Sequence, residues 1–240
     1  MRNPNGPYPG RQLFIGLTVD KRAALTYLVT GRSPQSRERR ATPLDNSIIV
    51  GPTGNQPYDP LRHYTAVKYN PRTGIAVVSN GIQTEAIFET YQLLLHTNSP
   101  ANAHYIELLL DGARAEPDSL NTPRIAGVIT CDNNTTPVFI IGIKRKDKPA
   151  AAFQVTPEPG TLIGISTYKG DIGNPKPFDP DTGLPKLQFH GNTAKELAKH
   201  LFGISSTHYE ADDIRVCSVG GIRLDDSHKW ELTIHNRHRG

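Results

Sequence analysis

Four arginines lie close together in the chain and form its densest group of side chains that could bind an anion. They are Arg32, Arg37, Arg39 and Arg40, all within nine residues. Guanidinium groups can hold the oxygens of one phosphate through paired hydrogen bonds, a geometry that lysine matches less well. The alternative is a solvated and mobile basic loop, and the residues alone favour this plainer interpretation.

The cysteines and histidines predict neither a nucleophile nor a metal site. Cys131 ends a predicted apolar strand and Cys217 lies inside another, which is typical of ordinary buried thiols. The nine histidines show no strong metal-ligand spacing, and His235 and His238 are too weak a pair to predict a site. The P-loop pattern and the dinucleotide-binding fingerprint are both absent from the sequence. General motifs therefore name no chemistry for this chain.

Composition and charge exclude several classes of protein. The 240 residues include 27 basic and 23 acidic ones, and this small excess, without a recognisable motif, argues against a nucleic-acid partner. Two cysteines are too few for a disulfide scaffold. Apolar stretches such as 138–143 are far shorter than the roughly 18 residues of a membrane helix. Because no leader-like segment opens the chain, we expect a cytoplasmic protein with no membrane partner.

The elements that must position the candidate side chains follow from the spacing of apolar residues. Apolar runs separated by turn residues predict two hairpins, over 12–30 and 64–79. Helical spacing predicts three helices, over 84–96, 101–113 and 193–202.

The last of these helices has recognisable ends. Asn192 can cap its N-terminus, and Gly203 can end it in a left-handed turn. Polar loops are predicted over 32–45 and 170–186. Further strands are predicted at 47–50, 124–130, 137–144, 153–156, 161–168, 215–224 and 229–234. Of these, 153–156 and 161–168 are expected to pair as a hairpin.

The grouping of strands and helices predicts the fold class. Many hairpin strands, with helices grouped rather than strictly alternating, indicate an α+β protein with largely antiparallel sheets. About eleven strands exceed one comfortable open sheet, so two stacked sheets with helices on their outer faces are expected. We expect one domain over 10–240, preceded by a flexible arm of polar, proline- and glycine-rich sequence over 1–9.

Six short motifs, taken in their order along the chain, together resemble one known family. They are Gly10–Arg11, Arg32–Ser33 with Arg37, Tyr64–Lys68, Ser79–Gly81 with Thr84 and Glu85, Leu120–Ile125, and Ile165–Tyr168. Each motif is weak by itself, but six in the same order and at similar spacing are hard to obtain by chance. The set resembles the archaeal-type inosine monophosphate (IMP) cyclohydrolase family, and the resemblance covers nearly the whole chain.

This resemblance implies a fold and a reaction. The fold implied is a four-layer α-β-β-α sandwich like that of the N-terminal-nucleophile hydrolases. The reaction is the last step of purine synthesis, in which the carboxamide nitrogen of formylaminoimidazole-carboxamide ribotide attacks the formyl group and water leaves to give IMP. The implied partner is this purine nucleotide, no metal or redox cofactor is implied, and the family forms homo-oligomers. The enzyme must hold the near-attack rotamer, remove an amide proton and stabilise the formyl oxygen.

The resemblance gives two residues catalytic roles. Glu116 is the acidic residue that would take the carboxamide proton, and Tyr64 would donate a hydrogen bond to the formyl oxygen. Without the resemblance, Glu116 is typical of an exposed loop glutamate beside Pro117. Tyr64 is equally typical of a strand aromatic that packs into the core.

The remaining candidates are assigned to substrate binding. They are Arg37, Arg32, Ser79, Asn80, Gly81, Asn121 and Arg124. Arg37 matches an active-site arginine that would contact the phosphate or the base, and Arg32 is a second candidate nearby. The Ser79–Gly81 turn offers free backbone N–H groups to an anion or carbonyl, although a simple helix cap is equally plausible. Arg124 could bind ligand or form a structural ion pair with Asp118.

Two alternative functions stay open. The first is a catalytically inactive purine-nucleotide binding protein on the same fold. The second is hydrolysis of a small amide, for which Thr130, Cys131 or an exposed serine would have to be the nucleophile.

Overall fold

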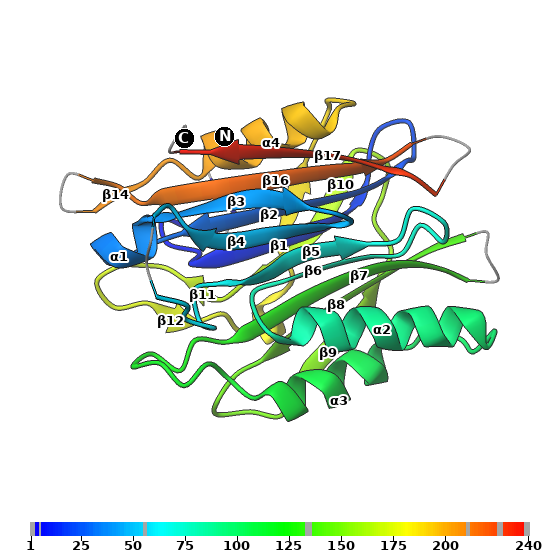
Figure 1. Ribbon diagram of the computed structural model, residues 1–240, viewed down its shortest axis with the longest axis horizontal. Coiled ribbons are helices and arrows are strands. Elements are labelled where there is room, and N and C mark those ends of the chain that lie inside the picture. The colour runs from blue at the N-terminus through cyan, green and yellow to red at the C-terminus, as the bar shows by residue number, and fades with distance from the viewer. Residues whose placement is uncertain are drawn as a thin grey trace.

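Two antiparallel sheets make up most of the chain. The computed structural model describes residues 3–4, 6–54, 57–132, 136–209, 212–224 and 228–237 (Figure 1). One sheet has six strands in the order β13-β10-β1-β2-β16-β17, and the other has seven in the order β3-β4-β5-β6-β7-β8-β9. The expectation of an α+β protein with two main antiparallel sheets is confirmed.

The six-stranded sheet is assembled from both ends of the chain. Its strands are β1 (Arg11–Leu17), β2 (Ala23–Thr30), β10 (Thr161–Ser166), β13 (Lys186–Gln188), β16 (Arg215–Arg223) and β17 (Trp230–Asn236). The predicted hairpin over 12–30 is confirmed, with Leu13 opposite Tyr27. All eight residues of β2 are buried, because it pairs with β1 on one edge and β16 on the other.

The seven-stranded sheet comes from one continuous stretch between these ends. Its strands are β3 (Arg39–Leu44), β4 (Ser47–Pro52), β5 (Tyr64–Tyr69), β6 (Ala76–Ser79), β7 (Arg124–Asp132), β8 (Thr136–Lys144) and β9 (Ala151–Val155). Each strand pairs with the next along the chain. The predicted hairpin over 64–79 is confirmed.

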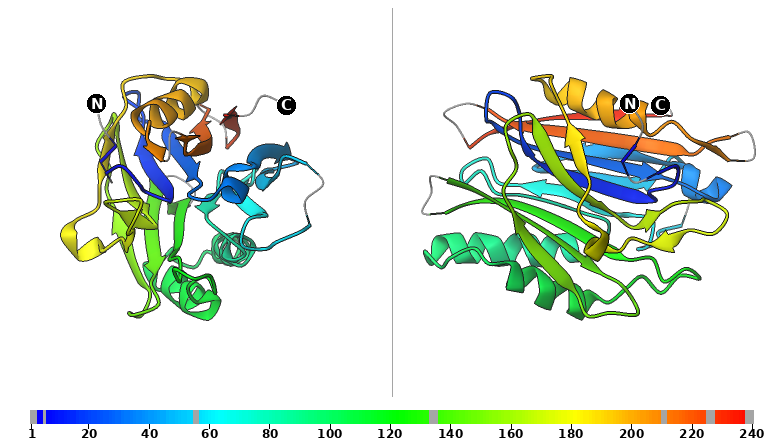
Figure 2. Two further views of the ribbon diagram at one scale, coloured as in Figure 1. Left: turned by 90° about the vertical axis from the view of Figure 1, so that its left-hand side faces the viewer. Right: turned by 180° about the vertical axis from the view of Figure 1, so that it is seen from behind.

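Helices cover the outer face of each sheet. The longer ones are α2 (Gln83–His96), α3 (Ala103–Ala113) and α4 (Ala194–Ile204). The minor elements are α1 (Pro34–Arg37), the 3-10 turn Pro180–Thr182 and two ribbons, β11 (Tyr168–Lys169) with β12 (Lys176–Pro177) and β14 (His208–Tyr209) with β15 (Asp212–Asp213). Figures 1 and 2 show α4 on the six-stranded sheet and the pair α2–α3 on the seven-stranded sheet.

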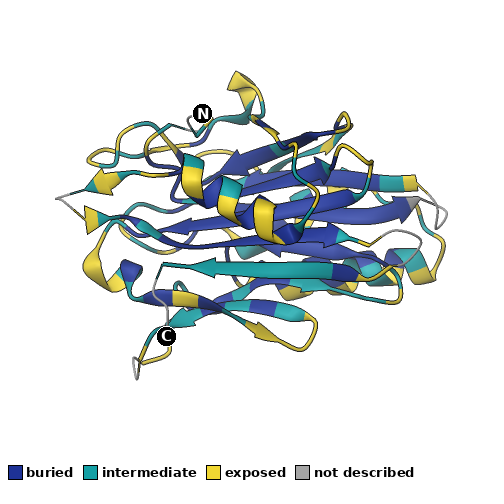
Figure 3. Ribbon diagram, turned by 90° about the horizontal axis from the view of Figure 1, so that it is seen from above, coloured by how far each residue is buried: buried dark blue, intermediate teal, exposed yellow. Residues whose placement is uncertain are grey.

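The main core lies between the two sheets. It contains Leu13 and Tyr27 of the six-stranded sheet together with Val78, Ile125 and Ile141 of the seven-stranded sheet. The burial colours of Figure 3 show the central strands almost wholly buried. Because both sheets give their inner faces to this core, residues that project from the ends of facing strands are brought together.

The predicted hairpin between 153–156 and 161–168 is wrong. Strand β9 pairs with β8, with Ile141 opposite Phe153. Strand β10 instead pairs with β1 in the other sheet. The two runs are correctly predicted as strands, but the short segment between them crosses from one sheet to the other. Apolar spacing marks a strand without identifying its partner.

The predicted loop over 32–45 is also wrong, because it contains α1 and β3. Pro34 begins α1, and Ser33 caps it by accepting a hydrogen bond from the Ser36 N–H. Strand β3 is the edge of its sheet, so only two of its residues, Arg39 and Ala41, are buried. An edge strand lacks the apolar alternation that predicts a half-buried one. The predicted loop 170–186 likewise includes β12 and a 3-10 turn.

The ends of α4 differ from the prediction by a few residues. Thr193, rather than Asn192, is the N-cap, because its hydroxyl accepts from the Glu196 N–H in a capping box. The helix continues through Gly203 and ends at Ile204. The sequence also predicts a turn at 225–227, between the strands predicted at 215–224 and 229–234, and these three residues lie outside the described ones.

Several described residues of the N-terminal segment contact the rest of the fold. Tyr8 is buried and stacks on Tyr168, with ring centroids 5.8 Å apart. The Asn3 side chain donates to Gln12, and the Pro9 carbonyl accepts from the Tyr168 N–H. Within the described ranges, no helix is both long enough and apolar enough to cross a membrane.

Candidate active site

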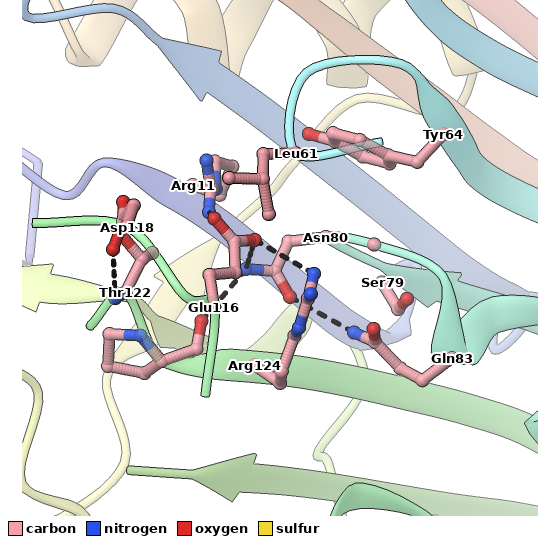
Figure 4. A network of polar contacts seen from close by, with 12 residues as sticks. Arg11, Leu61, Tyr64, Ser79, Asn80, Gln83, Glu116, Asp118, Thr122 and Arg124 are labelled. Atoms are coloured by element: carbon pink, nitrogen blue, oxygen red, sulfur yellow. Dashed lines mark hydrogen bonds and ion pairs between the residues drawn. The ribbon is translucent and has the colours of Figure 1, made fainter. Parts of the chain in front are cut away.

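A buried carboxylate between two arginines is the centre of the site. Glu116 is only 1% exposed, and its Oε2 lies 2.6 Å from Arg11 Nη2 while its Oε1 lies 3.0 Å from Arg124 Nη1 (Figure 4). Arg11 begins β1 and Arg124 begins β7, so the two guanidinium groups come from different sheets. Glu116 is therefore not the exposed loop residue that its neighbours alone suggest.

A tight turn holds Glu116 in place. Its N–H donates to the carbonyl of Thr122 at 2.9 Å. The carboxylate of Asp118 accepts from the Thr122 N–H at 2.8 Å and from its hydroxyl at 2.6 Å. Asn121 completes the turn at φ +48°, a left-handed conformation that asparagine tolerates better than most residues. Asp118 is thus occupied by Thr122, and Arg124 pairs with Glu116 instead.

The turn between β6 and α2 fixes the beginning of β7. Asn80 Oδ1 accepts from the Ile125 N–H at 2.8 Å and from Gln83 Nε2 at 3.1 Å, while its Nδ2 donates to the Pro123 carbonyl at 2.9 Å. The Ser79 hydroxyl lies 2.6 Å from that of Thr84. These contacts hold the backbone from which Arg124 projects.

Gly81 is required by a close approach. A Cβ added there would lie 2.0 Å from Arg124 Nη1 and 3.0 Å from Arg124 Cζ. The guanidinium that contacts Glu116 therefore occupies the space of the missing side chain. The Ser79–Gly81 turn therefore positions the Arg124 side chain, whether or not the turn also binds a ligand.

A cleft of about 330 Å³ opens onto this centre, near the lower end of the range for small-molecule sites. Glu116 and Arg11 line it, Tyr8 and Tyr168 contribute stacked rings, and Arg39 is buried in it. Further polar and charged lining residues are Arg32, Ser33, Ser36, Asp59, Arg62, Asp118, Ser119, Thr122 and Thr167. The cleft is therefore suited to a small, strongly polar ligand.

Several guanidinium groups retain unused donors. Among the described residues, Arg11 Nε, Arg39 Nη1 and Arg124 Nε are buried without a hydrogen-bond acceptor. Buried donors are normally paired, so those of Arg11 and Arg39, which line the cleft, indicate where ligand oxygens would complete the site. Burial lowers the pKa of Arg124. For Arg11, burial is opposed by Glu116 together with Tyr64 and Tyr27, and the combined effect raises the pKa. Both arginines are charged at neutral pH.

Tyr64 belongs both to the core and to the surroundings of the site. It is 5% exposed, and its hydroxyl lies 2.9 Å from that of Tyr27. Burial raises its pKa above the ordinary 10.0, although the charges of Arg11 and Arg39 oppose this rise. Tyr64 also lines a separate, mainly apolar hollow of about 530 Å³ with Ile82.

The two predicted arginines of the basic segment are placed differently. Arg32 lines the cleft. Arg37 is buried outside it, where its Nη2 donates to Asp212 at 2.8 Å and its Nη1 donates to the Arg32 carbonyl at 2.9 Å. Arg32 thus lies at the cleft, and Arg37 lies outside it and holds the Arg32 backbone through a hydrogen bond.

The sequence analysis assigned no role in the site to Arg11 or Tyr168, and it considered Arg39 only as one of four arginines that could bind an anion. Arg11 and Tyr168 lie within motifs that carried the family resemblance, and Arg39 lies within the arginine group. The signal was therefore present, but only the folded chain shows which members of each motif meet. Thr122 also emerges, because its hydroxyl lies 2.6 Å from that of Tyr168.

Thr130 and Cys131, two of the candidate nucleophiles for amide hydrolysis, lie far from the cleft. Cys131 is seven residues beyond Arg124 on β7, which is about 23 Å along a strand. Thr130 and Cys131 are both buried, and burial raises the pKa of Cys217 to about 12. Within the described ranges, no group of three or more His, Cys, Asp or Glu residues could hold a metal ion.

A buried carboxylate held by arginines at the base of a small basic cleft defines a protein that handles a small anionic compound. A family model described as "IMP cyclohydrolase-like protein" matches residues 8–227. The protein named IMP cyclohydrolase from Methanothrix thermoacetophila is 29% identical over 95% of this chain and 98% of its own length. Those from Haloarcula marismortui and Methanocaldococcus jannaschii are each 32% identical, over 89% and 90% of this chain and 92% and 97% of their own. The chain belongs to the archaeal-type IMP cyclohydrolase family, which confirms the resemblance of its six motifs.

Proposed function

We propose that the protein is an IMP cyclohydrolase, which closes formylaminoimidazole-carboxamide ribotide to IMP in de novo purine biosynthesis. Family membership supports this function. The observation that carries it is Glu116, a carboxylate that is almost completely buried between Arg11 and Arg124 and yet lines a cleft.

In the proposed reaction, Glu116 acts first as a base and then as an acid. The carboxamide nitrogen forms a bond to the formyl carbon and gives one proton to Glu116. The formyl oxygen then takes up this proton and the proton of the formamido nitrogen. It leaves as water, and the ring closes with a new C=N bond. No atom is needed beyond those of the substrate, so the enzyme supplies only orientation, proton transfer and electrostatic stabilisation.

The basic wall of the cleft is proposed to hold the substrate phosphate. Arg32 and Arg39 line this wall with the hydroxyl groups of Ser33 and Ser36, and Arg39 Nη1 has no acceptor. Forked guanidinium contacts match phosphate oxygens well. In this proposal Arg37 acts indirectly, by holding the Arg32 carbonyl.

The developing charge on the formyl oxygen is proposed to meet Tyr64. Because burial raises the pKa of Tyr64, the phenol is a neutral donor at physiological pH. Arg124 would orient Glu116 and offer its Nε to the substrate. Asn80 and Gly81 would keep Arg124 in place, and Asn121 would shape the turn that carries Glu116.

An absorbance assay tests this function directly. Purified protein is mixed with the formylated ribotide, and hypoxanthine formation is followed in the ultraviolet. We expect acceleration of about a million-fold over uncatalysed closure, the low end for enzymes. Glu116→Gln should slow turnover by about 10²–10⁴-fold, the usual share of a general base. Glu158→Gln, an exposed site in a loop, is the matched control and should turn over normally.

The alternative is a nucleotide-binding protein without activity. Calorimetry with IMP separates the two. Binding of IMP without ring closure would support the alternative and remove the catalytic role of Glu116. Absence of both binding and turnover would contradict both functions.

We further propose that residues 10–240 act as one domain whose fold is related to the N-terminal-nucleophile hydrolases. The stacked antiparallel sheets between outer helices support this relation. Following the family resemblance, we also propose a homo-oligomer. Sedimentation velocity tests this point, and a monomer at micromolar concentration would contradict it.

A further inference from the structure

Two buried phenols meet between the sheets beside the cleft. Tyr27 belongs to β2 and is fully buried, whereas Tyr64 begins β5 in the other sheet. Their hydroxyl oxygens lie 2.9 Å apart. In Figure 4 the hydroxyl end of Tyr64 points toward Leu61 and Arg11, on the side of the buried carboxylate.

A count of donors and acceptors indicates which of the two phenols donates the hydrogen bond. Each phenol carries one O–H donor. Among the described residues, the Tyr27 hydroxyl has no hydrogen-bond partner other than Tyr64. If Tyr64 were the donor, the Tyr27 proton would be buried without an acceptor, which is costly. If Tyr27 is the donor, the proton without an acceptor among the described residues is that of Tyr64. Tyr64 is 5% exposed, and its hydroxyl end points toward Arg11 of the cleft (Figure 4), where a ligand can accept the proton.

We propose that Tyr27 is a positioning residue for ring closure, which donates to Tyr64 and so directs the Tyr64 proton at the formyl oxygen of the substrate. This inference rests on the proposed function and extends it to a residue that does not touch the substrate. Tyr27 fixes both the position of the Tyr64 oxygen and the direction of its proton. In linked hydrogen bonds, each donor is strengthened by the one behind it.

The charges around the pair favour this role. Burial raises the pKa of both phenols, so both are protonated at neutral pH. The positive charges of Arg11 and Arg39 act on both rings in the opposite direction. The hydrogen bond from Tyr27 further favours negative charge on Tyr64. Tyr64 is thereby a neutral donor that tolerates the charge it gains as the formyl oxygen becomes negative.

A double-mutant cycle tests the proposal. Turnover is measured for the wild type, Tyr27→Phe, Tyr64→Phe and the double variant. We expect Tyr64→Phe to lower kcat by about 10²–10³-fold, as for loss of one oxyanion donor. Tyr27→Phe should lower kcat roughly 3- to 10-fold, the value of one neutral hydrogen bond, with KM nearly unchanged. In the Tyr64→Phe background, Tyr27→Phe should have no further effect on kcat.

A matched control separates positioning from general loss of packing. Tyr91 is also a buried tyrosine, and its hydroxyl donates to the Asn102 carbonyl at 2.6 Å, between α2 and α3. Tyr91→Phe should therefore leave kcat unchanged. If Tyr27→Phe does not fold, 3,5-difluorotyrosine at position 27 retains the shape and makes the hydroxyl a stronger donor. It should raise kcat when Tyr64 is present and leave kcat unchanged in Tyr64→Phe.

The outcomes distinguish the inference from the function on which it rests. If Tyr64→Phe is slow and Tyr27→Phe turns over like the wild type, the Tyr27 inference alone is wrong. An equal loss from Tyr27→Phe in both backgrounds would mean a structural role and would also overturn it. If Tyr64→Phe is as fast as the wild type, the catalytic role of Tyr64 fails together with the inference.

Discussion

At the scale of single residues, the charges of the cleft divide into those already satisfied and those left for a ligand. Arg62 pairs with Asp59 at 2.6 Å, and Arg11 pairs with the buried glutamate at the same distance. Within the described part of the chain, Arg32 and Arg39 have no carboxylate partner. Their charge is therefore available to a dianion, which is what a nucleotide phosphate would supply.

Arg39 is the clearest test of this division. Its Nε donates to the Ser36 carbonyl at 2.8 Å, while Nη1 is buried without an acceptor. Because a hydrogen bond to a charged group contributes about 1.5–3 kcal/mol, Arg39→Gln should raise KM roughly 10- to 150-fold. Steady-state kinetics measures this change. Arg40→Gln, the exposed neighbour, is the control, and equal KM values for both variants would remove Arg39 from the phosphate site.

The protonation of Tyr64 predicts a pH dependence. Burial, opposed by Arg11 and Arg39, raises its pKa above 10.0. A raised pKa keeps the neutral phenol present to higher pH. The ratio of wild-type kcat to that of Tyr64→Phe should therefore be constant from neutral pH to about 10 and decline only above it. Parallel pH–rate profiles measure this ratio, and a decline near pH 8 would contradict the assignment.

At the scale of elements, the turn between β6 and α2 affects the site because Gly81 has no side chain and so leaves room for the Arg124 guanidinium. An alanine methyl at Gly81 would lie 2.0 Å from Arg124 Nη1. Gly81→Ala should therefore displace the guanidinium from Glu116 and lower kcat by at least tenfold, with the fold retained. Circular dichroism and turnover are measured together.

Gly112 provides the matched control for this substitution. It lies in α3, and a Cβ there would meet nothing within 4 Å. Gly112→Ala should leave turnover unchanged and stabilise the helix by roughly 0.5–1 kcal/mol. Normal turnover in Gly81→Ala would show that the position of Arg124 does not depend on the missing side chain.

The elements that were predicted correctly are those whose signal is local. The hairpin over β1 and β2 and the helix α2 are encoded by spacing within a few residues. Strand β3 was not predicted because it is an edge strand, and its sequence lacks the apolar alternation that marks a half-buried strand. The partners of β9 and β10 were not predicted because pairing depends on which sheet each strand joins, and this is decided by contacts distant in sequence.

At the scale of the whole molecule, one side chain makes a pair of hydrogen bonds between the edge strands of the two sheets. Asn236, at the end of β17, accepts from the Ala41 N–H and donates to the Ala41 carbonyl, each at 2.9 Å. Ala41 lies on β3, the edge strand of the other sheet. The Asn236 amide thus makes the two hydrogen bonds with the Ala41 backbone that a neighbouring strand would otherwise make.

Removing this side chain should weaken the contact between the sheets. Asn236→Ala loses two hydrogen bonds and should lower the free energy of unfolding by about 1–3 kcal/mol. Asn236→Asp keeps the acceptor for the Ala41 N–H but sets a carboxylate oxygen against the Ala41 carbonyl oxygen, so a loss at least as large is expected. Urea denaturation measures both variants, and an unchanged midpoint in Asn236→Ala would show that the edges are held by other contacts.

The site illustrates what sequence can and cannot provide at this scale. Glu116 and Arg124 are eight residues apart, and Glu116 lies just before the motif Leu120–Ile125 that contains Arg124. Arg11 lies more than a hundred residues earlier, and nothing local indicates that it reaches the same carboxylate. Tyr27 lies 37 residues before Tyr64 and in the other sheet. These residues meet because the two sheets stack. Apolar spacing predicts that the sheets stack, but it does not predict which residues of one sheet face which residues of the other.

The continuity of the seven-stranded sheet has a consequence for how the protein could be divided. All of its strands lie between Arg39 and Val155, so the chain enters this layer once and leaves it once. Glu116 and Tyr64 belong to that middle portion, while Arg11 and Tyr27 belong to the flanking portion. Cutting at the two crossings would yield an insert with Glu116 and only one of its two arginines, Arg124, and a host with Arg11 but no acid. Neither fragment alone should catalyse ring closure, and activity should return only when the two fragments associate.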